Sequence, residues 1–152
     1  MLASSTEKLL LTLWVGSLWA IGYIAVPMAF GSLTDLTVAG NYAGKLFSVV
    51  NLLGMGCGSV LLITMLLRRG RQTLSNWRFW ILVLMVVLTL VFNFYLQPEI
   101  AAIKQFAWQQ DAELNARFSW LHTVSKNLYM LISLLGLALV LTTDKLLDQS
   151  RA

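Results

Sequence analysis

The chain has 152 residues, of which 58% are hydrophobic and 12% charged, and its mean hydropathy is +0.73. Soluble globular domains carry about 25% charged residues, so this composition excludes an ordinary soluble domain and predicts an integral membrane protein. The formal net charge of +4 does not indicate a nucleic-acid partner, because the basic residues are not gathered into a recognisable binding module.

Four charge-poor segments are each long enough to cross a hydrocarbon core, which takes about 20 helical residues. Backbone groups in lipid must be satisfied within their own segment, and no strand-like alternation is visible, so these segments are expected to be helices. The sequence therefore predicts an all-α fold: an integral membrane four-helix bundle that forms one domain over residues 1–152. The spans are expected at approximately 9–31, 45–67, 78–97 and 119–143.

The first two spans carry signals for helix packing. Pro27, in "VPMAF", removes a backbone donor and is expected to bend or end the first span. Lipid gives helices no hydrophobic reason to associate, so close approach depends on small residues. The packing candidates of the second span are Gly40, Gly44, Gly54 and Gly58. A self-association face, for a homo-oligomer or another membrane protein, is the alternative interpretation.

The loop between the second and third spans predicts the orientation in the membrane. The sequence "RRGRQTLSNWR" holds Arg68, Arg69, Arg71 and Arg78, and short loops rich in Arg and Lys stay in the cytoplasm. We therefore expect a multi-pass protein of a bacterial-type inner membrane with both termini cytoplasmic. Binding of an anionic lipid or a partner is the alternative role for these arginines.

The connection between the third and fourth spans is expected to contain a short amphipathic helix. Pro98 can start a helix, and Ile100, Ile103 and Phe106 recur at helical spacing with charged residues between them. Such a helix would lie on or near the outer membrane face with its polar side wet. Asp111 is placed to cap the helix that runs into the fourth span.

Polar residues gather at the start of the fourth span, in "FSWLHTVSKNLYM". Ionisable groups within spans are costly and are therefore candidates for a functional site, and histidine is the group that titrates near neutral pH. Residues from the first outer loop and from the end of the third span are expected at the same depth. The candidates for an outward-facing ligand pocket are His122, Lys126, Asp35, Ser119 and Asn93. A structural clasp that ties helix ends together is the alternative.

Cofactor and enzyme chemistry find little support in the sequence. One histidine and one cysteine, Cys57, cannot build a closed zinc site. Haem would need His122 together with a methionine such as Met28, an open position or a second subunit. No cofactor is predicted, and haem or a metal ion at His122 is kept as an alternative. No nucleophile elbow, phosphate loop or carboxylate pair is present, so no catalytic residue is assigned and no familiar soluble type of enzyme is expected.

Several segments resemble a known family. "WVGSLWAIGYIAVPMAF", "AGNYAGKLF", "PEI" and "FSWLHTVSKNLYML" are similar to the transmembrane protein 205-like family, catalogued as domain of unknown function 4149. The resemblance implies a compact four-helix membrane protein, distantly like copper resistance D-type membrane domains and haem-associated four-helix membrane oxidases. It matches family-pattern positions at Trp14, Gly16, Pro27, Phe30, Gly40, Gly44, Phe47, Phe118, His122 and Ser125.

Three functions follow as hypotheses. The first is a solute or metal-ion handling module with a role in transport, which uses the outward-facing pocket. The second is a non-enzymatic membrane scaffold or accessory subunit, which the glycine-rich helix faces favour. The third is a haem-binding redox protein, which depends on His122 and the distant resemblance. In each case the lipid bilayer is the expected surroundings and nucleic acid is not an expected partner.

Overall fold

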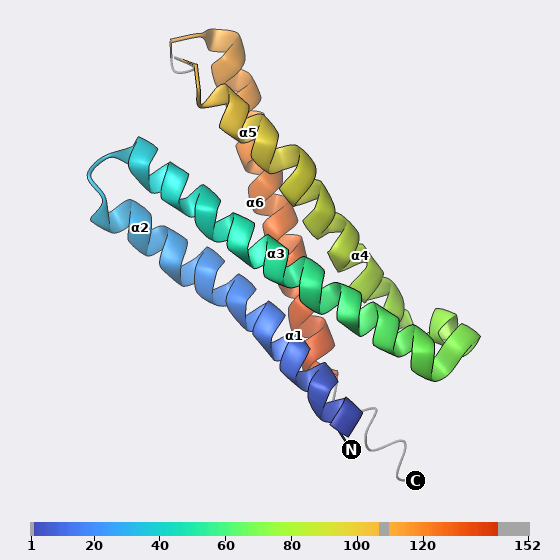
Figure 1. Ribbon diagram of the computed structural model, residues 1–152. Coiled ribbons are helices and arrows are strands. Elements are labelled where there is room, and N and C mark those ends of the chain that lie inside the picture. The colour runs from blue at the N-terminus through green and yellow to red at the C-terminus, as the bar shows by residue number, and fades with distance from the viewer. Residues whose placement is uncertain (1, 107–109, 143–152) are drawn as a thin grey trace.

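The computed structural model describes residues 2–106 and 110–142, and every regular element within these ranges is a helix (Figure 1). The predicted all-α fold with four membrane-capable helices is confirmed. The elements are α1 (Leu2–Ala20), the π-helix η1 (Ile21–Ala25), α2 (Val26–Ser32), α3 (Leu36–Arg69), the 3₁₀-helix η2 (Gly70–Ser75), α4 (Trp77–Val91), the π-helix η3 (Phe92–Leu96), α5 (Gln97–Ile103) and α6 (Ala112–Leu141).

The spans are longer than the sequence predicts. They cover Ser5–Ser32, Leu36–Arg68, Trp77–Ile103 and Ala112–Leu141, which are 27 to 33 residues each. At 1.5 Å per residue they are about 40–50 Å long, more than the roughly 30 Å of a hydrocarbon core. Helices of this length are long enough to cross the core with a tilt or with their ends beyond it. Residue 143, the predicted end of the fourth span, lies outside the described residues.

Two aspartates account for the early starts of the second and fourth spans. The Asp35 carboxylate accepts hydrogen bonds from the backbone N–H groups of Thr37 and Val38, at 2.7 and 3.3 Å, and thereby caps α3. Asp111 caps α6 in the same way, as predicted, with contacts of 2.9 and 3.2 Å. Each cap satisfies backbone donors that the helix itself cannot. The helices therefore begin in segments that composition alone reads as loop.

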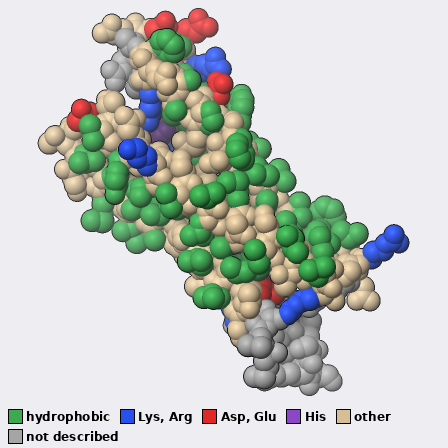
Figure 2. Space-filling view, in the orientation of Figure 1, with side chains coloured by type: hydrophobic (Ala, Val, Ile, Leu, Met, Phe, Trp, Pro, Cys, Tyr) green, Lys and Arg blue, Asp and Glu red, His purple; other side chains and the backbone are tan. Residues whose placement is uncertain are grey.

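The outer surface of the bundle is suited to lipid. Large apolar side chains remain exposed along all four spans, and Figure 2 shows them over much of the visible face. Leu67 is 83% exposed and Leu52 is 68% exposed. Exposed apolar area on this scale would be a large aggregation-prone surface in water. In a bilayer it is the ordinary outer face of a multi-pass helical protein.

The four spans pack in a ring, α1 against α3, α3 against α4, α4 against α6 and α6 against α1. The fully buried Trp14 lies inside this ring. A Cβ atom added at Gly54 would lie 2.3 Å from the Trp14 indole nitrogen, and one added at Gly58 would lie 2.4 Å from a methyl group of Val86. Both glycines of α3 therefore allow close contact within the chain.

The first and third spans share one irregularity. Each contains a five-residue π-helix, Ile21–Ala25 or Phe92–Leu96, and each is followed by a proline, Pro27 or Pro98. Proline donates no hydrogen bond and clashes with the carbonyl four residues earlier, and a wider turn accommodates this change. The first span therefore continues through Pro27 to Ser32.

The chain consists of two hairpins with the same plan. One comprises α1, η1, α2 and α3, and the other comprises α4, η3, α5 and α6. In each hairpin a span with a π-helix and a proline leads to a loop, an aspartate cap and a long returning helix. Both first helices start at the same end of the molecule (Figure 1). The two hairpins are therefore arranged as a parallel repeat.

The predicted short helix after the third span has a different position. Helical residues occur there as α5, but α5 continues the third span through η3 instead of forming a separate surface helix. It ends at Ile103, and turn residues follow to Phe106. The apolar pattern at Ile100 and Ile103 is explained by packing into the bundle, where Ile103 is buried. Ala107, part of the predicted connection, lies outside the described residues.

Candidate functional site

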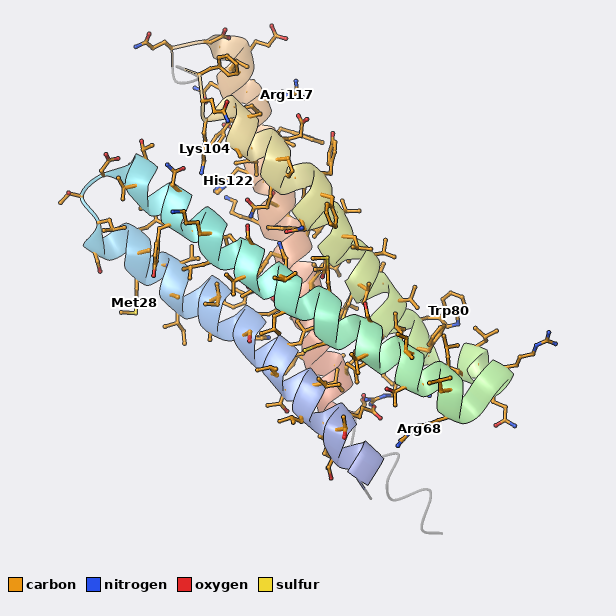
Figure 3. All side chains as sticks on the ribbon, viewed as in Figure 1. Met28, Arg68, Trp80, Lys104, Arg117 and His122 are labelled. Atoms are coloured by element: carbon orange, nitrogen blue, oxygen red, sulfur yellow. The ribbon has the colours of Figure 1, made fainter. Side chains whose placement is uncertain are left out.

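The two hairpins diverge at the end of the molecule farthest from the first residues of α1 and α4 (Figure 1). Figure 2 shows a hollow at this end, with the histidine inside it and basic side chains around it. Figure 3 shows Lys104 and His122 projecting into the space between α3 and the α5–α6 pair. We refer to the space around Lys104, His122 and Lys126 as the Lys104 hollow.

Lys104 connects the two hairpins across the hollow. It follows the last residue of α5, and its Nζ donates a hydrogen bond of 3.2 Å to the backbone carbonyl of Gly40 in α3. A Cβ atom at position 40 would lie 3.3 Å from this Nζ, so glycine leaves room for the ammonium group. Burial lowers the pKa of the Lys104 ammonium group. The charged ammonium group of Lys104 is therefore only partly solvated.

His122 lies on α6 and faces the same hollow. Its ring stacks on that of Phe118, with centroids 5.8 Å apart and planes inclined by 7°. The positive charges of Lys126 and Lys104 both act on the imidazole. Three basic side chains from two segments therefore lie near one another, with Lys104 half-buried and His122 and Lys126 exposed. Such an arrangement favours an anion and opposes a cation.

The other three predicted pocket residues differ in their surroundings. Asp35 is exposed, and its carboxylate caps α3 as described above. Ser119 is exposed on α6, and Asn93 is half-buried within η3. The charges of Lys126 and Lys104 act on His122, whereas the Asp35 carboxylate accepts from the backbone at the start of α3.

Lys104 was missed by the sequence reasoning, which placed it in a surface connection. The available signal is helical spacing. Lys104 follows Ile100 by four residues and therefore lies on the same side as an apolar position that packs on the core. A helix that continues through Pro98 brings the lysine to the inner face of the bundle. This continuation depends on the π-helix η3, and Pro98 is the one residue in the sequence that signals it.

Polar groups continue from the hollow into the bundle along α6. Ser125 and Tyr129 follow His122 at helical spacing, and both are buried. The Tyr129 hydroxyl donates a hydrogen bond of 2.6 Å to the Leu18 carbonyl, and its ring contacts those of Phe47 and Phe92. Tyr129 thus joins both hairpins beneath the hollow.

Three buried polar atoms have no hydrogen-bond partner among the described residues: Trp14 Nε1, Asn51 Nδ2 and Ser125 Oγ. Buried polar groups in proteins are nearly always paired with protein atoms or with water. These atoms provide polar sites within an otherwise apolar interior.

The opposite end of the bundle holds a buried arginine. The Arg78 side chain is 4% exposed, and its guanidinium donates to Glu7 Oε1 at 3.3 Å and to Thr142 Oγ1 at 2.7 Å. The sequence marks Arg78 only as one of several loop arginines. Its burial could not be inferred, because the pairing with Glu7 joins positions 71 residues apart. Within residues 2–106 and 110–142, no group of three His, Cys, Asp or Glu side chains is placed to hold a metal ion.

Together these features define a multi-pass four-helix membrane protein with a basic hollow at one end and a buried ion pair at the other. The family model described as "Domain of unknown function (DUF4149)" matches residues 9–108, and the chain belongs to this family. The match covers the first three spans and Lys104, whereas His122 and Lys126 lie beyond it. Searches among curated proteins and among solved structures gave no match.

Proposed function

We propose that this protein is a solute-handling module of a bacterial-type inner membrane that binds an anionic solute in the Lys104 hollow. The observation that carries the proposal is the grouping of three basic side chains, the half-buried Lys104 and the exposed His122 and Lys126, at the end where the hairpins diverge. An anion placed among them would offset the positive charges of the two lysines. It would also gain charge-assisted hydrogen bonds, which are about twice as strong as neutral ones.

The repeat supports a role in solute handling. Transporters built from repeats often bind their substrates between the repeats, beside helices whose regular hydrogen bonding is interrupted. Here the π-helices η1 and η3 occupy corresponding positions in the two hairpins, and Tyr129 contacts residues of both. π-helices are frequent at functional sites. The polar groups beneath the hollow, including Ser125 and Asn51, offer further contacts for a solute that moves inward.

The other functional hypotheses are less well supported. A metal-ion site at the hollow would place a cation beside two lysines. Gly54 and Gly58, which motivated the scaffold hypothesis, pack against side chains within the chain. A haem-binding role depends on one histidine, several methionines and the distant resemblance, and kinship with copper resistance D-type domains depends on the resemblance alone. The resemblance to the transmembrane protein 205-like family adds a four-helix architecture without a mechanism.

The proposal is tested by binding of simple anions to the detergent-purified protein. The probes are inorganic phosphate, sulfate and short carboxylates, with zinc and copper ions as the cationic comparison, and the readout is the unfolding midpoint against ligand concentration. At least one anion is expected to stabilise the protein. Loss of one charged hydrogen bond, about 1.5–3 kcal/mol, corresponds to roughly tenfold or more in affinity. His122→Gln and Lys126→Gln are each expected to weaken binding by that factor.

Arg117→Gln is the matched control. Arg117 lies at the same end of the molecule and pairs with Glu99 (Figure 3). Its loss should leave anion binding unchanged if the hollow is the site. Equal losses for Arg117→Gln and His122→Gln would contradict a defined site. Stabilisation by zinc or copper that depends on His122, without any anion effect, would favour metal handling instead.

A further inference from the structure

A pocket of about 70 Å³ lies at the end of the bundle that contains Arg78. Residues of α1, α3 and the start of α4 line it, and we refer to it as the Arg78 pocket. Its polar lining includes Glu7, Arg68, Asn76 and Arg78. A single water needs roughly 10–15 Å³ of such space, so the pocket has room for a compact polar group. It is separate from the Lys104 hollow and does not depend on the proposed function.

The floor of the pocket is a fixed positive group. The Arg78 guanidinium is held by Glu7 on α1 and by Thr142 next to α6. Burying an arginine is costly unless it is paired, and the contacts with two other segments keep the guanidinium in place. The site is therefore organised before any ligand binds. The Arg78–Glu7 ion pair has an N–O distance of 3.3 Å.

The charges around the pocket favour an anion. Glu7 offsets one of the two arginines, and Arg68 adds a second positive charge at the rim. Figure 3 shows the Arg68 side chain reaching from the end of α3 toward α1. Asn76, which caps α4, also lines the pocket, so the partial positive charge of a 15-residue helix begins there. Arginines and helix N-termini are both common partners of phosphate groups.

The position of the pocket indicates where the phosphate comes from. Its remaining walls include the apolar side chains of Leu10, Leu61 and Met65. The spans exceed the hydrocarbon thickness, so the pocket lies near headgroup depth. Trp80, at the same end, is exposed and donates to the Leu74 carbonyl at 2.9 Å, as expected for an aromatic residue at the interface. A lipid phosphate with acyl chains beside it matches these surroundings.

We propose that the Arg78 pocket binds the phosphate of an anionic lipid, held between Arg68 at the rim and the paired Arg78 at the floor. Arg68 supplies the exchangeable contact, because it is exposed and reaches the pocket from α3. The Arg78–Glu7 pair positions the site. The arginine-rich loop would then have a specific lipid ligand in addition to its effect on orientation.

The experiment measures lipid binding to the full-length protein by native mass spectrometry, with phosphatidylglycerol and phosphatidylcholine as probes. Wild type is expected to retain phosphatidylglycerol preferentially. Arg68→Gln should weaken this binding by about tenfold, the equivalent of about 1.4 kcal/mol. Arg71→Gln is the matched control, because Arg71 is exposed in η2 beyond the residues that line the pocket. Equal losses in the two variants would overturn the proposal in favour of general attraction to anionic membranes.

Two further arms make the test sharper. Glu7→Gln removes the competing negative charge but keeps a side-chain oxygen that can accept from Arg78 and hold it in place. It is expected to strengthen phosphatidylglycerol binding in protein that remains folded. Weaker binding by folded Glu7→Gln protein would overturn the assignment. The second arm uses inorganic phosphate alone. Arg68-dependent binding of inorganic phosphate, without selectivity for phosphatidylglycerol over phosphatidylcholine, would identify a site for the free ion and overturn the lipid proposal.

Discussion

The half-buried position of Lys104 predicts a pH dependence of anion binding. Burial lowers the pKa of this group, so it loses its proton at a lower pH than an exposed lysine. If Lys104 contributes to anion binding, the affinity of the wild type should fall with rising pH at a lower pH than that at which ordinary lysines deprotonate. The measurement is the dissociation constant of the stabilising anion between pH 7 and pH 10.

The matched variant for this pH dependence is Lys104→Arg. Arginine keeps its charge throughout this range because its pKa exceeds about 12, so the Lys104→Arg profile should be flatter than that of the wild type. Identical profiles for the two proteins would contradict a role for the Lys104 charge in binding. A uniformly weaker but flat Lys104→Arg profile would still agree with it, since the longer side chain alters the contact with Gly40.

Two glycines on α3 provide a matched pair for packing. Gly54 lies against Trp14, whereas a Cβ atom at Gly56 would meet no neighbour within 4 Å. Gly54→Ala is expected to destabilise the protein by about 1–3 kcal/mol, the usual cost of overpacking a core. Gly56→Ala should cause no loss, because alanine is the better helix former. Unfolding in mixed detergent micelles compares the two, and equal stabilities would contradict the close contact at Trp14.

A functional residue can be predicted from the sequence when its local segment makes it unusual, and it is missed when distant contacts create its surroundings. His122 and Lys126 were found because polar groups stand out in an apolar segment. Asp35 was read as a pocket residue, although an aspartate three residues before Val38 is also a helix-cap signal. Lys104 and Arg78 were missed because their surroundings are created by contacts distant in sequence, 64 residues to Gly40 and 71 to Glu7.

At the scale of elements, Tyr129 joins the first π-helix to the fourth span. Its hydroxyl donates to Leu18, and its ring lies close to Gly22 within η1. Hydrogen bonds between membrane helices contribute on average about 0.6 kcal/mol and at most about 1.7 kcal/mol. Tyr129→Phe is therefore expected to lower the free energy of unfolding by about 1 kcal/mol while preserving the packing of the ring.

Tyr95→Phe is the control for Tyr129→Phe, since Tyr95 is 54% exposed and lies within the other π-helix. Unfolding of both variants in the same micelles separates the buried hydroxyl from a general effect of removing a phenol. A loss of stability in Tyr95→Phe as large as that in Tyr129→Phe would contradict the assigned hydrogen bond.

The elements were predictable in number and type, but their lengths and irregularities were not. Four long apolar segments require helices, because lipid offers the backbone no other partners. The second and fourth spans begin earlier than predicted, because Asp35 and Asp111 cap helices that start within polar sequence. Pro27 and Pro98 signal interruptions, yet a bend, an end and a π-helix share that same signal. In the structure a π-helix precedes each proline and an α-helix continues beyond it.

At the scale of the whole molecule, the two ends differ in chemistry. One has the Lys104 hollow between diverging hairpins, and the other has the Arg78 pocket and the arginine-rich loop. If the arginines remain in the cytoplasm, the hollow opens to the outside and the pocket meets the cytoplasmic leaflet. This leaflet carries the negative surface potential that attracts basic segments. The orientation thus determines which compartment supplies each ligand.

This orientation predicts the labelling of single cysteines in intact cells. Cys57→Ala provides a background without thiols, since Cys57 is the chain's single cysteine. Thr34→Cys then places a thiol between α2 and α3, and Ser75→Cys places one at the end of η2; both positions are exposed. A membrane-impermeant maleimide should label Thr34→Cys in intact spheroplasts and Ser75→Cys only after permeabilisation. The reverse labelling pattern would contradict the predicted orientation. The Lys104 hollow would then face the cytoplasm and bind cytoplasmic anions.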